Sequence, residues 1–434
     1  MFDRMSIKKI VEKIPGYDTL VLPYHKIQAW RAADKADYPA AGLKVIGVTG
    51  TNGKTTTCFM IYQMLKSAGK KVGLMTTVGW GVDKVNNQVT HMTTAPPKLL
   101  NKRIREITNA GAEFLVLELT SHSLAQYRAF GVPIDIAVMT NVTHEHLDYH
   151  KTFAHYVDAK RKLFRQAQTT RDGKKIGVVN ADDPSARYFT SAVSHPLTYG
   201  IENGDLLARQ VKLNPDGVEY FIKYGGEKYH IKTHLSGKFN VYNSLAAVAV
   251  GLSYDLTKEQ IERGILALTD VEGRMNIVDE GQDFHVIVDY AHTPDSFEQL
   301  FSDLAGTAKG RVISVFGSAG GRRDPSKRAP QGEIAGKYSD IVIVTEEDDR
   351  DTPGEEILDQ IASGAEISGK VRGENLFLVP DRTDAIKLAF ETARRGDLVL
   401  LLGKGHEKTI ERADGAHPWN EIELARKLLR ELER

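Results

Sequence analysis

The chain has 434 residues, enough for two or three domains with separate hydrophobic cores, and its composition is typical of a globular protein. Lysine plus arginine and aspartate plus glutamate each number 57, so no overall basic charge favours nucleic acid as a partner. The N-terminus lacks an apolar core of signal-peptide length, and no apolar run approaches the ~18 residues of a membrane span. We therefore expect a cytoplasmic protein without membrane insertion, with a monomer as the default. Cys58, the only cysteine, excludes intrachain disulfides and cysteine-built metal centres.

Short apolar runs alternate with longer amphipathic segments through the first half of the chain. The runs begin at Lys44, Lys70, Phe114, Ile134 and Lys175. Apolar runs of this length, separated by helical segments, predict βαβ units around a mostly parallel sheet. Residues 206–235 instead alternate around turn signals, which predicts antiparallel hairpins on the edge of this first domain.

The alternation of strands and helices restarts beyond Thr269, in runs such as FHVIVDYAH and DLVLLLG. We therefore place a domain boundary there. The sequence predicts an α/β protein with a reduced N-terminal segment at residues 1–42, a central P-loop domain with a mostly parallel sheet at 43–268, and a C-terminal Rossmann-like domain at 269–434.

The stretch VIGVTGTNGKTTT, residues 45–57, follows a predicted strand and opens a predicted helix, as a phosphate-binding loop requires. Gly50 and Gly53 would let backbone N–H groups approach phosphates, Lys54 would reach the β- and γ-phosphates, and Thr55 would offer its hydroxyl to Mg²⁺. The strict motif has glycine where Val48 stands. The alternative is a glycine turn that merely ends in Lys-Thr.

A carboxylate closes the predicted strand of VLELTSHSLAQYR, residues 116–128. Ligands of open α/β sheets bind beyond the carboxyl ends of the strands, so Glu118 is well placed to hold a metal beside the phosphate loop. For Glu118 taken alone, a solvated charge at a strand end is the better interpretation. The buried character of the preceding run favours the metal.

Possible metal ligands crowd the stretch THEHLDYH, residues 143–150, which follows another predicted strand. His144, His146, Asp148 and His150 come close to the HxHxDH pattern of metallo-β-lactamase-type hydrolases, so zinc is one interpretation. Magnesium with a single histidine ligand is a second, and ordinary loop histidines are the third. The residues alone leave these open.

Eight motifs, in order, resemble those of the Mur ligases, a family of ATP-dependent amide ligases. They are GVTGTNGKTTT, ELTSHSLAQYR, NVTHEHLDYH, YVDAKRKLF, GRMNIV, VDYAHTPDS, FGSAGGRRD with SKR, and GKGHE. Within the family the resemblance is to the MurE type, which adds the third amino acid to UDP-MurNAc-L-Ala-D-Glu in peptidoglycan precursor synthesis. It runs from about residue 44 to residue 430.

The resemblance implies a reaction in which the γ-phosphate of ATP moves to a substrate carboxylate. The incoming amine then attacks the acyl phosphate through a tetrahedral intermediate. Both steps gather negative charge, which suits a lysine acting together with Mg²⁺. The implied catalytic residues are Lys54, Glu118, His146 and Lys160. The implied magnesium ligands are Thr55, Glu118, His146 and Lys160, the last as the lysine that the family carbamylates.

The resemblance also assigns binding residues for the two larger substrates. ATP would be bound by Gly50, Thr51, Asn52, Gly53, Lys54, Thr55, Thr56, Asn243, Arg274, Asp289 and His292. The muramoyl-dipeptide-like acceptor would be bound by Thr93, Thr94, Ser121, Gln126 and Arg128. Met92 stands where the family often has asparagine before the paired threonines, so this edge of the acceptor pocket departs from the pattern.

For the incoming amino acid, the implied residues are Arg323, Glu347, Asp348, Asp349, Arg350, Gly403 and Glu407. The family's DNPR signature for diaminopimelate is replaced here by EDDR, residues 347–350. Arg350 could pair with the second carboxylate of meso-diaminopimelate. The three acidic residues before it favour an amine-bearing side chain such as that of L-lysine. A diamino acid is expected, and the choice between these two stays open.

The N-terminal end departs most from the resemblance, because MurE-type enzymes usually place a complete uridine-nucleotide-binding domain before the phosphate loop. We expect either that a reduced element around Tyr24 to Trp30 holds the UDP group or that UDP matters less. The competing hypotheses are a related ligase of polyglutamyl or cyanophycin-like acids, a non-catalytic ATP-binding protein, and a zinc hydrolase. Family members close the C-terminal domain over the nucleotide, which predicts rotation near residues 269–273.

Overall fold

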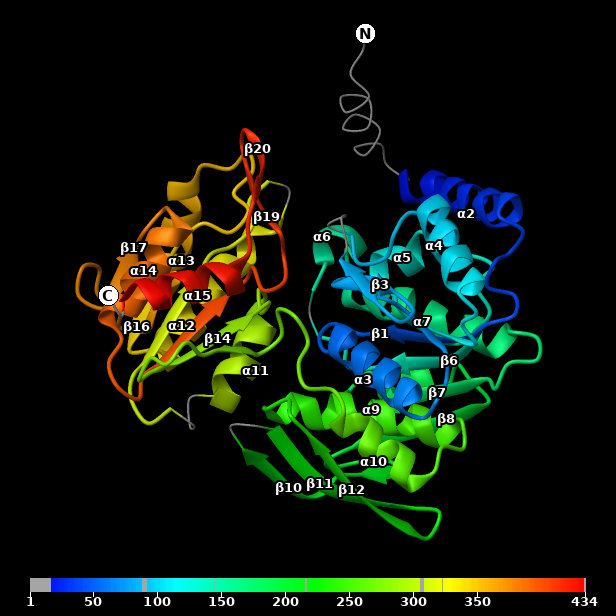
Figure 1. The fold of residues 1–434 in the computed structure, drawn as a ribbon. Helices are drawn as coiled ribbons and strands as arrows, with labels where there is room; N and C mark the ends of the chain where they lie inside the picture. The colour runs from blue at the N-terminus through cyan, green and yellow to red at the C-terminus, as the bar shows by residue number, and fades with distance from the viewer. Residues whose placement is uncertain are drawn as a thin grey trace.

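The computed structural model of the chain describes residues 17–87, 92–143, 145–214, 217–304, 308–321 and 323–432. The side chains of residues 17–21, 87, 147 and 148 also lie outside the description. Figure 1 shows two α/β units side by side, one built around β1 and one around β14. We call them the central unit and the C-terminal unit.

The central unit is built on a nine-stranded sheet with the order β4-β3-β2-β5-β1-β6-β7-β8-β9. Its strands are β1 Lys44–Thr49, β2 Val72–Met75, β3 Gly79–Gly81, β4 Val85–Asn87, β5 Phe114–Glu118, β6 Ile134–Met139, β7 Ile176–Asn180, β8 His195–Gly200 and β9 Leu206–Leu207. From β2 to β9 every neighbouring pair is parallel, and only the pairs β2–β3 and β3–β4 at one edge are antiparallel. The predicted mostly parallel sheet is confirmed.

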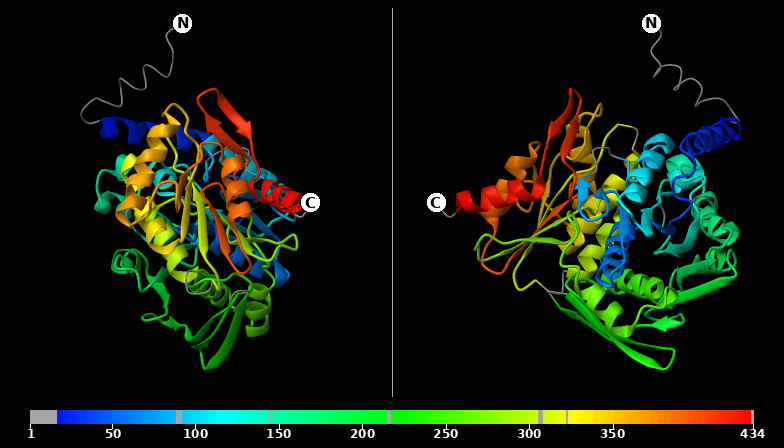
Figure 2. Two further views of the ribbon diagram at one scale, coloured as in Figure 1. Left: turned by 90° about the vertical axis from the view of Figure 1, so that its left-hand side faces the viewer. Right: turned by 45° about the vertical axis from the view of Figure 1, so that its right-hand side comes forward.

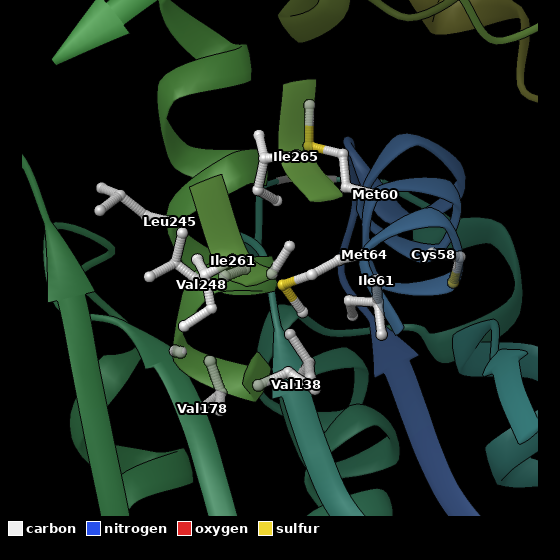
Figure 3. Close-up of a cluster of buried hydrophobic side chains, with 14 of the residues drawn as sticks. Cys58, Met60, Ile61, Met64, Val138, Val178, Leu245, Val248, Ile261 and Ile265 are labelled. Atoms are coloured by element: carbon white, nitrogen blue, oxygen red, sulfur yellow. The ribbon is translucent and has the colours of Figure 1, made fainter. Parts of the chain in front are cut away.

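Helices cover both faces of this sheet. One face carries α3 Lys54–Ser67, α9 Lys238–Ser253 and α10 Lys258–Leu266, and the other carries α4 Pro97–Asn109, α7 Phe153–Thr169 and α8 Ala186–Thr190. Two short helices, α5 Ser121–Ala125 and α6 Leu147–His150, follow β5 and β6. Figure 3 shows the first face, where Met64 of α3 lies among side chains of α9 and α10. Cys58 is part of this core and is fully buried.

The expected antiparallel hairpins form a separate three-stranded sheet. Its strands are β10 Arg209–Asn214, β11 Gly217–Tyr224 and β12 Glu227–Thr233, in that order. Gly225 and Gly226 both have positive φ, at 58° and 84°, which a two-residue hairpin turn between β11 and β12 requires. Tyr220 and Ile231 of this sheet pack into the core beneath α9 and α10.

The C-terminal unit is a six-stranded sheet with the order β13-β14-β18-β15-β16-β17. The strands are β13 Asn276–Val278, β14 His285–Asp289, β15 Val312–Phe316, β16 Ile341–Val344, β17 Leu376–Leu378 and β18 Leu398–Leu402, and only β13 is antiparallel. One face packs on α11 Pro294–Leu304, α12 Arg328–Tyr338 and α13 Gly354–Ile367, and the other on α14 Arg382–Thr392 and α15 Glu421–Leu432. The short helix η1 Pro325–Lys327 and the hairpin of β19 Thr409–Arg412 and β20 Gly415–Pro418 complete the unit, which Figure 2 shows from two further sides.

The described N-terminal part is one helix, α2 Tyr17–Lys35, which packs against α4 through residues such as Ala29 and Ala33. Tyr24, Ile27 and Trp30 lie on its outer side and are about half exposed. None of the helices in the described part of the chain is both long and apolar enough to cross a membrane.

Candidate functional site

A glycine-rich loop, residues 50–53, connects the carboxyl end of β1 to the start of α3. Gly50 has φ 156°, and a Cβ atom there would lie 1.8 Å from Oγ1 of Thr140. Gly53 has φ 79°, in the left-handed region that favours glycine. Since both positions need glycine, the predicted phosphate-binding loop has the backbone geometry of one.

The loop is held in place by the segment that follows β6. The backbone N–H of Thr51 donates to the carbonyl of Asn141 at 2.8 Å, and the N–H of Asn52 donates to Oδ1 of the same Asn141 at 2.8 Å. Thr140 donates its hydroxyl to the carbonyl of Asn52 at 2.6 Å. The loop tip is therefore fixed before any ligand arrives.

Two lysines lie against this loop, and both donate to backbone carbonyls. Nζ of Lys54 lies 2.6 Å from the carbonyl of Thr51, and Nζ of Lys160 lies 2.5 Å from that of Gly50. Lys160 is fully buried and lies over the ring of Tyr156. Burial lowers the pKa of Lys160 well below its usual range, and the charge on Lys54 lowers it further.

Glu118 lies at the end of β5, next to the phosphate loop, and is 1% exposed. Its carboxylate accepts the hydroxyl of Thr55 at 3.0 Å, and it accepts both the backbone N–H and the hydroxyl of Thr77, at 3.0 and 3.1 Å. Arg274 from the C-terminal unit reaches Oγ1 of Thr55 at 3.4 Å. Thr55 and Glu118 thus present a hydroxyl and a carboxylate side by side, as an oxygen-liganded cation such as Mg²⁺ would need.

His146 follows β6 whereas Glu118 ends β5, and both side chains line the same cavity. Its backbone has φ 56°, a conformation that is rare outside glycine and that gathers at functional sites. Burial and the charge on Lys160 lower the pKa of His146 to about 3, so the imidazole is neutral and able to bind a metal. Its ring packs edge-on against that of His122, with centroids 4.6 Å apart.

The other possible ligands of the stretch at 143–150 are His144, Asp148 and His150. His144 and the side chain of Asp148 lie outside the described residues. His150 is buried, its pKa is lowered to about 3 by burial and by His122, and its Nε2 has no hydrogen-bond partner among the described residues. Within the same described residues, no group of three His, Cys, Asp or Glu side chains gathers into a metal centre. A centre with Glu118 and His146 would therefore draw its further ligands from other residue types.

Residues that the resemblance assigns to the acceptor also gather at the carboxyl edge of the central sheet. Arg128 donates to the carbonyl of Thr94 at 2.7 Å and, with two nitrogens, to Oε1 of Gln126 at 2.8 and 3.0 Å. Oγ1 of Thr93 lies 2.9 Å from Oγ1 of Thr77, the residue that also holds Glu118, so the Thr93 hydroxyl can donate to that of Thr77. Oγ of Ser121 is buried without a hydrogen-bond partner in the described part of the chain, and Ser121 is not among the residues that line the cavity.

The residues assigned to the nucleotide come from both units and meet around the phosphate loop. Asn243 of α9 lies so close to Gly53 that a Cβ there would lie 2.2 Å from its Oδ1. Asp289 accepts two backbone N–H groups, from Met275 and Ala291, at 2.8 and 2.7 Å. Burial, and next the charge on Lys327, lower the pKa of His292 to about 4. These side chains line a cavity of about 910 Å³ together with Lys54, Thr93, Arg128, Arg274, Arg323 and Glu407.

The acidic loop at residues 347–350 lies behind Glu407, in a network of charges. Lys404 is fully buried and donates to Asp348 at 2.7 Å and to Glu407 at 2.6 Å. Arg350 also donates to Asp348, at 3.3 Å. A Cβ on Gly403 would lie 2.9 Å from Oε2 of Glu347. The predicted amino-acid residues are thus brought together, although Arg323 lies at the cavity and the loop lies beyond it.

Two carboxylate oxygens of this loop have no hydrogen-bond donor among the described residues. Oε2 of Glu347 and Oδ1 of Asp349 are buried and accept no hydrogen bond from any described residue. Burial, and next the charge of Glu346, raise the pKa of Asp349 to about 6. Lys404, by contrast, compensates Asp348. The loop therefore retains unsatisfied acceptors that suit a cationic group.

Several site residues were missed by the sequence analysis. They are Thr77, Asn141, Tyr156 and Asp295, which hold Glu118 or the phosphate loop. Thr77 and Asn141 each follow a strand of the central sheet, so the rule that singled out Glu118 would have found them. Tyr156 and Asp295 lie on helices, where spacing gives no comparable signal.

The chain is similar to known proteins over most of its length. The family described as Mur ligase middle domain matches residues 48–251, and the one described as Mur ligase, glutamate ligase domain, matches residues 273–405. A UDP-N-acetylmuramyl-tripeptide synthetase of Roseiflexus sp. (strain RS-1) is 41% identical over 408 residues, which cover 91% of this chain and 80% of that protein. A UDP-N-acetylmuramoyl-L-alanyl-D-glutamate–2,6-diaminopimelate ligase 1 of Clostridium acetobutylicum is 37% identical over 437 residues, 99% of this chain and 87% of that protein.

Solved structures match as well. A UDP-N-acetylmuramoyl-L-alanyl-D-glutamate–2,6-diaminopimelate ligase superposes with a TM-score of 0.62 at 29% identity, over 90% of this chain and 79% of that one. A folylpolyglutamate synthase of Mycobacterium tuberculosis superposes with a TM-score of 0.71 at 15% identity, over 92% and 95% of the two chains. The second likeness shows the fold alone.

Proposed function

This chain belongs to the Mur ligase family, and we propose that it is an ATP-dependent ligase that joins an amino acid to a UDP-MurNAc-L-Ala-D-Glu-like acid. The observation that supports this most directly is one cavity. It is lined by the phosphate loop, by acceptor residues such as Thr94 and Arg128, and by Arg323 and Glu407 of the C-terminal unit. Three substrates would meet there, as an acyl-phosphate mechanism requires.

Lys54 would supply positive charge where the triphosphate lies, because its Nζ ends on a carbonyl of the phosphate loop. The side chains present suit Mg²⁺: Thr55 and Glu118 offer adjacent oxygens, and His146 offers a neutral nitrogen. When bound, Mg²⁺ would supply a Lewis acid that offsets the negative charge of the transferring phosphoryl group. Thr55, Glu118, His146 and carbamylated Lys160 are the proposed ligands.

The environment of Lys160 supports its carbamylation. A lysine reacts with CO₂ only as the neutral amine, whose lone pair forms the N–C bond while a proton is released. The lowered pKa of Lys160 favours this neutral form. The product carboxylate would lie next to Gly50 and Tyr156 and would turn a cation into a metal ligand.

For the incoming amino acid we propose a diamino acid, meso-diaminopimelate or L-lysine. The unsatisfied oxygens of Glu347 and Asp349 suit a distal ammonium group. Arg350 donates to Asp348 at 3.3 Å, and a substrate carboxylate could replace Asp348 in this long contact. The first feature is common to both candidates, whereas only meso-diaminopimelate would use the second.

The experiment that tests the function is a matrix of acceptors and amino acids, with ADP release as the readout. Acceptors would include the muramoyl-dipeptide with and without UDP and a polyglutamyl acid. We expect ADP release only when a muramoyl-dipeptide acceptor and a diamino acid are present together. Release with ATP alone, or stimulation by the polyglutamyl acid only, would contradict the proposal.

A further inference from the structure

Helix α11 of the C-terminal unit is bonded to the central unit at both of its ends. Near its start, Oδ2 of Asp295 accepts the side-chain amide of Asn52 at 2.5 Å and the hydroxyl of Thr143 at 3.1 Å. At its other end, Oδ2 of Asp303 accepts the backbone N–H of Lys238, the first residue of α9, at 2.5 Å. Figure 1 shows α11 on the side of the C-terminal unit that faces α9.

The partners of Asp295 are the two segments that carry the phosphate-side chemistry. Asn52 is at the tip of the phosphate loop, and Thr143 precedes Glu145 and His146. The two segments are also bonded to each other, because the N–H of Thr143 donates to Oγ1 of Thr51 at 2.9 Å. A single carboxylate oxygen of the C-terminal unit therefore contacts both segments at once.

The backbone of Asn52 is already held by the central unit, through Asn141 on its N–H and Thr140 on its carbonyl. Its side-chain amide is the part that reaches across to the other unit. Hydrogen bonds to a charged acceptor are about twice as strong as those between neutral groups. Because Asp295 belongs to the C-terminal unit, this contact requires that unit to be docked, and it restrains the side chain of Asn52 in addition to its backbone.

We propose that Asp295 is a positioning residue that couples docking of the C-terminal unit to the geometry of the phosphate loop and of the His146 segment. The proposal rests on the proposed function only in one respect, that the phosphate loop binds ATP. Asp295 itself transfers no group. It restrains Asn52 and Thr143 in the docked arrangement, and the reacting groups are aligned as a consequence.

Asp303 provides the matched comparison, because it lies on the same helix and makes the same kind of bond to the central unit. Its partner, however, is the start of α9 and not the phosphate loop. A purely structural role of α11 in holding the units together would involve both aspartates equally. A positioning role at the loop involves Asp295 alone.

The test is a pair of double-mutant cycles, Asp295→Ala with Asn52→Ala and Asp303→Ala with Asn52→Ala. We expect Asp295→Ala to lower kcat about tenfold with KM for ATP within about twofold, and its effect to overlap with that of Asn52→Ala. The Asp303 and Asn52 effects should multiply independently. Asp295→Asn, which keeps the shape of the side chain but not its charge, should give a smaller loss and serves if the alanine variant is unstable.

Hydrogen exchange provides a readout that does not depend on turnover. Peptides covering residues 50–56 and 141–146 should exchange faster in Asp295→Ala than in the unaltered protein, and Asp303→Ala should leave them unchanged. Unaltered exchange in Asp295→Ala, independent effects of Asp295→Ala and Asn52→Ala, or equal coupling from Asp303 would each overturn the inference. Failure of the unaltered protein to release ADP with any acceptor would instead count against the proposed function.

Discussion

The site has two sides, the phosphate loop and the acidic loop at residues 347–350 beyond the cavity, which we call the phosphate wall and the amino-acid wall. The two walls treat charge in opposite ways. On the phosphate side, Lys54 donates to a backbone carbonyl and has no carboxylate partner among the described residues. On the amino-acid side, Asp348 shares Lys404 with Glu407, and yet Glu347 and Asp349 keep unsatisfied oxygens. One wall therefore has spare positive charge and the other has spare acceptors. This difference matches an anionic phosphate on one side and an amine on the other.

The two walls also differ in how their groups are fixed. The phosphate side is anchored by backbone groups at strand ends, such as the N–H of Asn52 and the carbonyl of Gly50. The amino-acid side is anchored by side chains bonded to side chains, with Lys404 at the centre. Backbone anchoring leaves little freedom to substitution, whereas a side-chain network can change its specificity through a few residues. The amino-acid wall is thus where we expect related ligases to diverge.

Replacing Lys160 by methionine should have the largest effect, because it removes a group at the phosphate loop. We expect turnover to fall about a thousandfold, as for loss of a group that stabilises transition-state charge. Small carboxylic acids should restore part of the activity if the native group is a carbamate. Arg165→Met, on the exposed side of the same helix, is the matched control. Rescue by small amines, or unchanged activity, would show that the phosphate wall does not carry the carboxylate proposed at this position.

A smaller effect is expected on the other wall, where Glu347→Gln removes a charge and keeps the shape. The Michaelis constant for a diamino acid should rise about tenfold, since an ammonium loses a charged acceptor, while that for ATP stays unchanged. Steady-state kinetics with each substrate varied in turn would measure both. Glu355→Gln, in the exposed first turn of α13, is the control. An equal rise in the constant for ATP would show that the two walls are not separate.

The sequence predicted the strand-end part of the site and less of the rest. Glu118 and the phosphate loop follow buried parallel strands, so their common edge could be expected before their contacts were known. Lys160 came only from the resemblance to a family, because its position on α7 reads as one charge among several. The bond between Asp295 and Asn52 joins positions 243 residues apart, and no local pattern encodes it. Local periodicity gives elements and edges, but contacts between units depend on how the units dock.

The sequence also showed no sign that Lys404 would neutralise Asp348 on the amino-acid wall. EDDR at residues 347–350 shows three acids beside an arginine, and from this alone all three acids would be equally available to an amine. The structure shows that Lys404, from a distant strand end, is bonded to Asp348. Only Glu347 and Asp349 keep carboxylate oxygens without a donor among the described residues, so these two acids are the expected contacts of a substrate ammonium group.

The smallest effect concerns the pH dependence of stability, through Asp349. Its pKa is about 6 in the folded chain and 3.8 as a free group, because burial and the neighbouring Glu346 disfavour its charge. The folded state therefore binds the proton more tightly than the unfolded state. The stabilisation is fully present below about pH 4 and is lost as the pH rises to about 6. Asp349→Asn, which cannot ionise, should be more stable than the unaltered protein at pH 7 by about 1 kcal/mol, after allowance for solvent screening.

Thermal unfolding at pH 7 and pH 4 measures this difference, which should be an increase of about 2 °C in Tm at pH 7 and close to zero at pH 4. Asp351→Asn, at an exposed neighbouring position, should show no such pH dependence. A saturating diamino acid should narrow the gap at pH 7, because its ammonium would give the charged Asp349 a partner. If Asp349→Asn were instead less stable at pH 7, a cation of the chain would already neutralise this carboxylate. The amino-acid wall would then have one fewer acceptor for the substrate, and Glu347 alone would carry the contrast with the phosphate side.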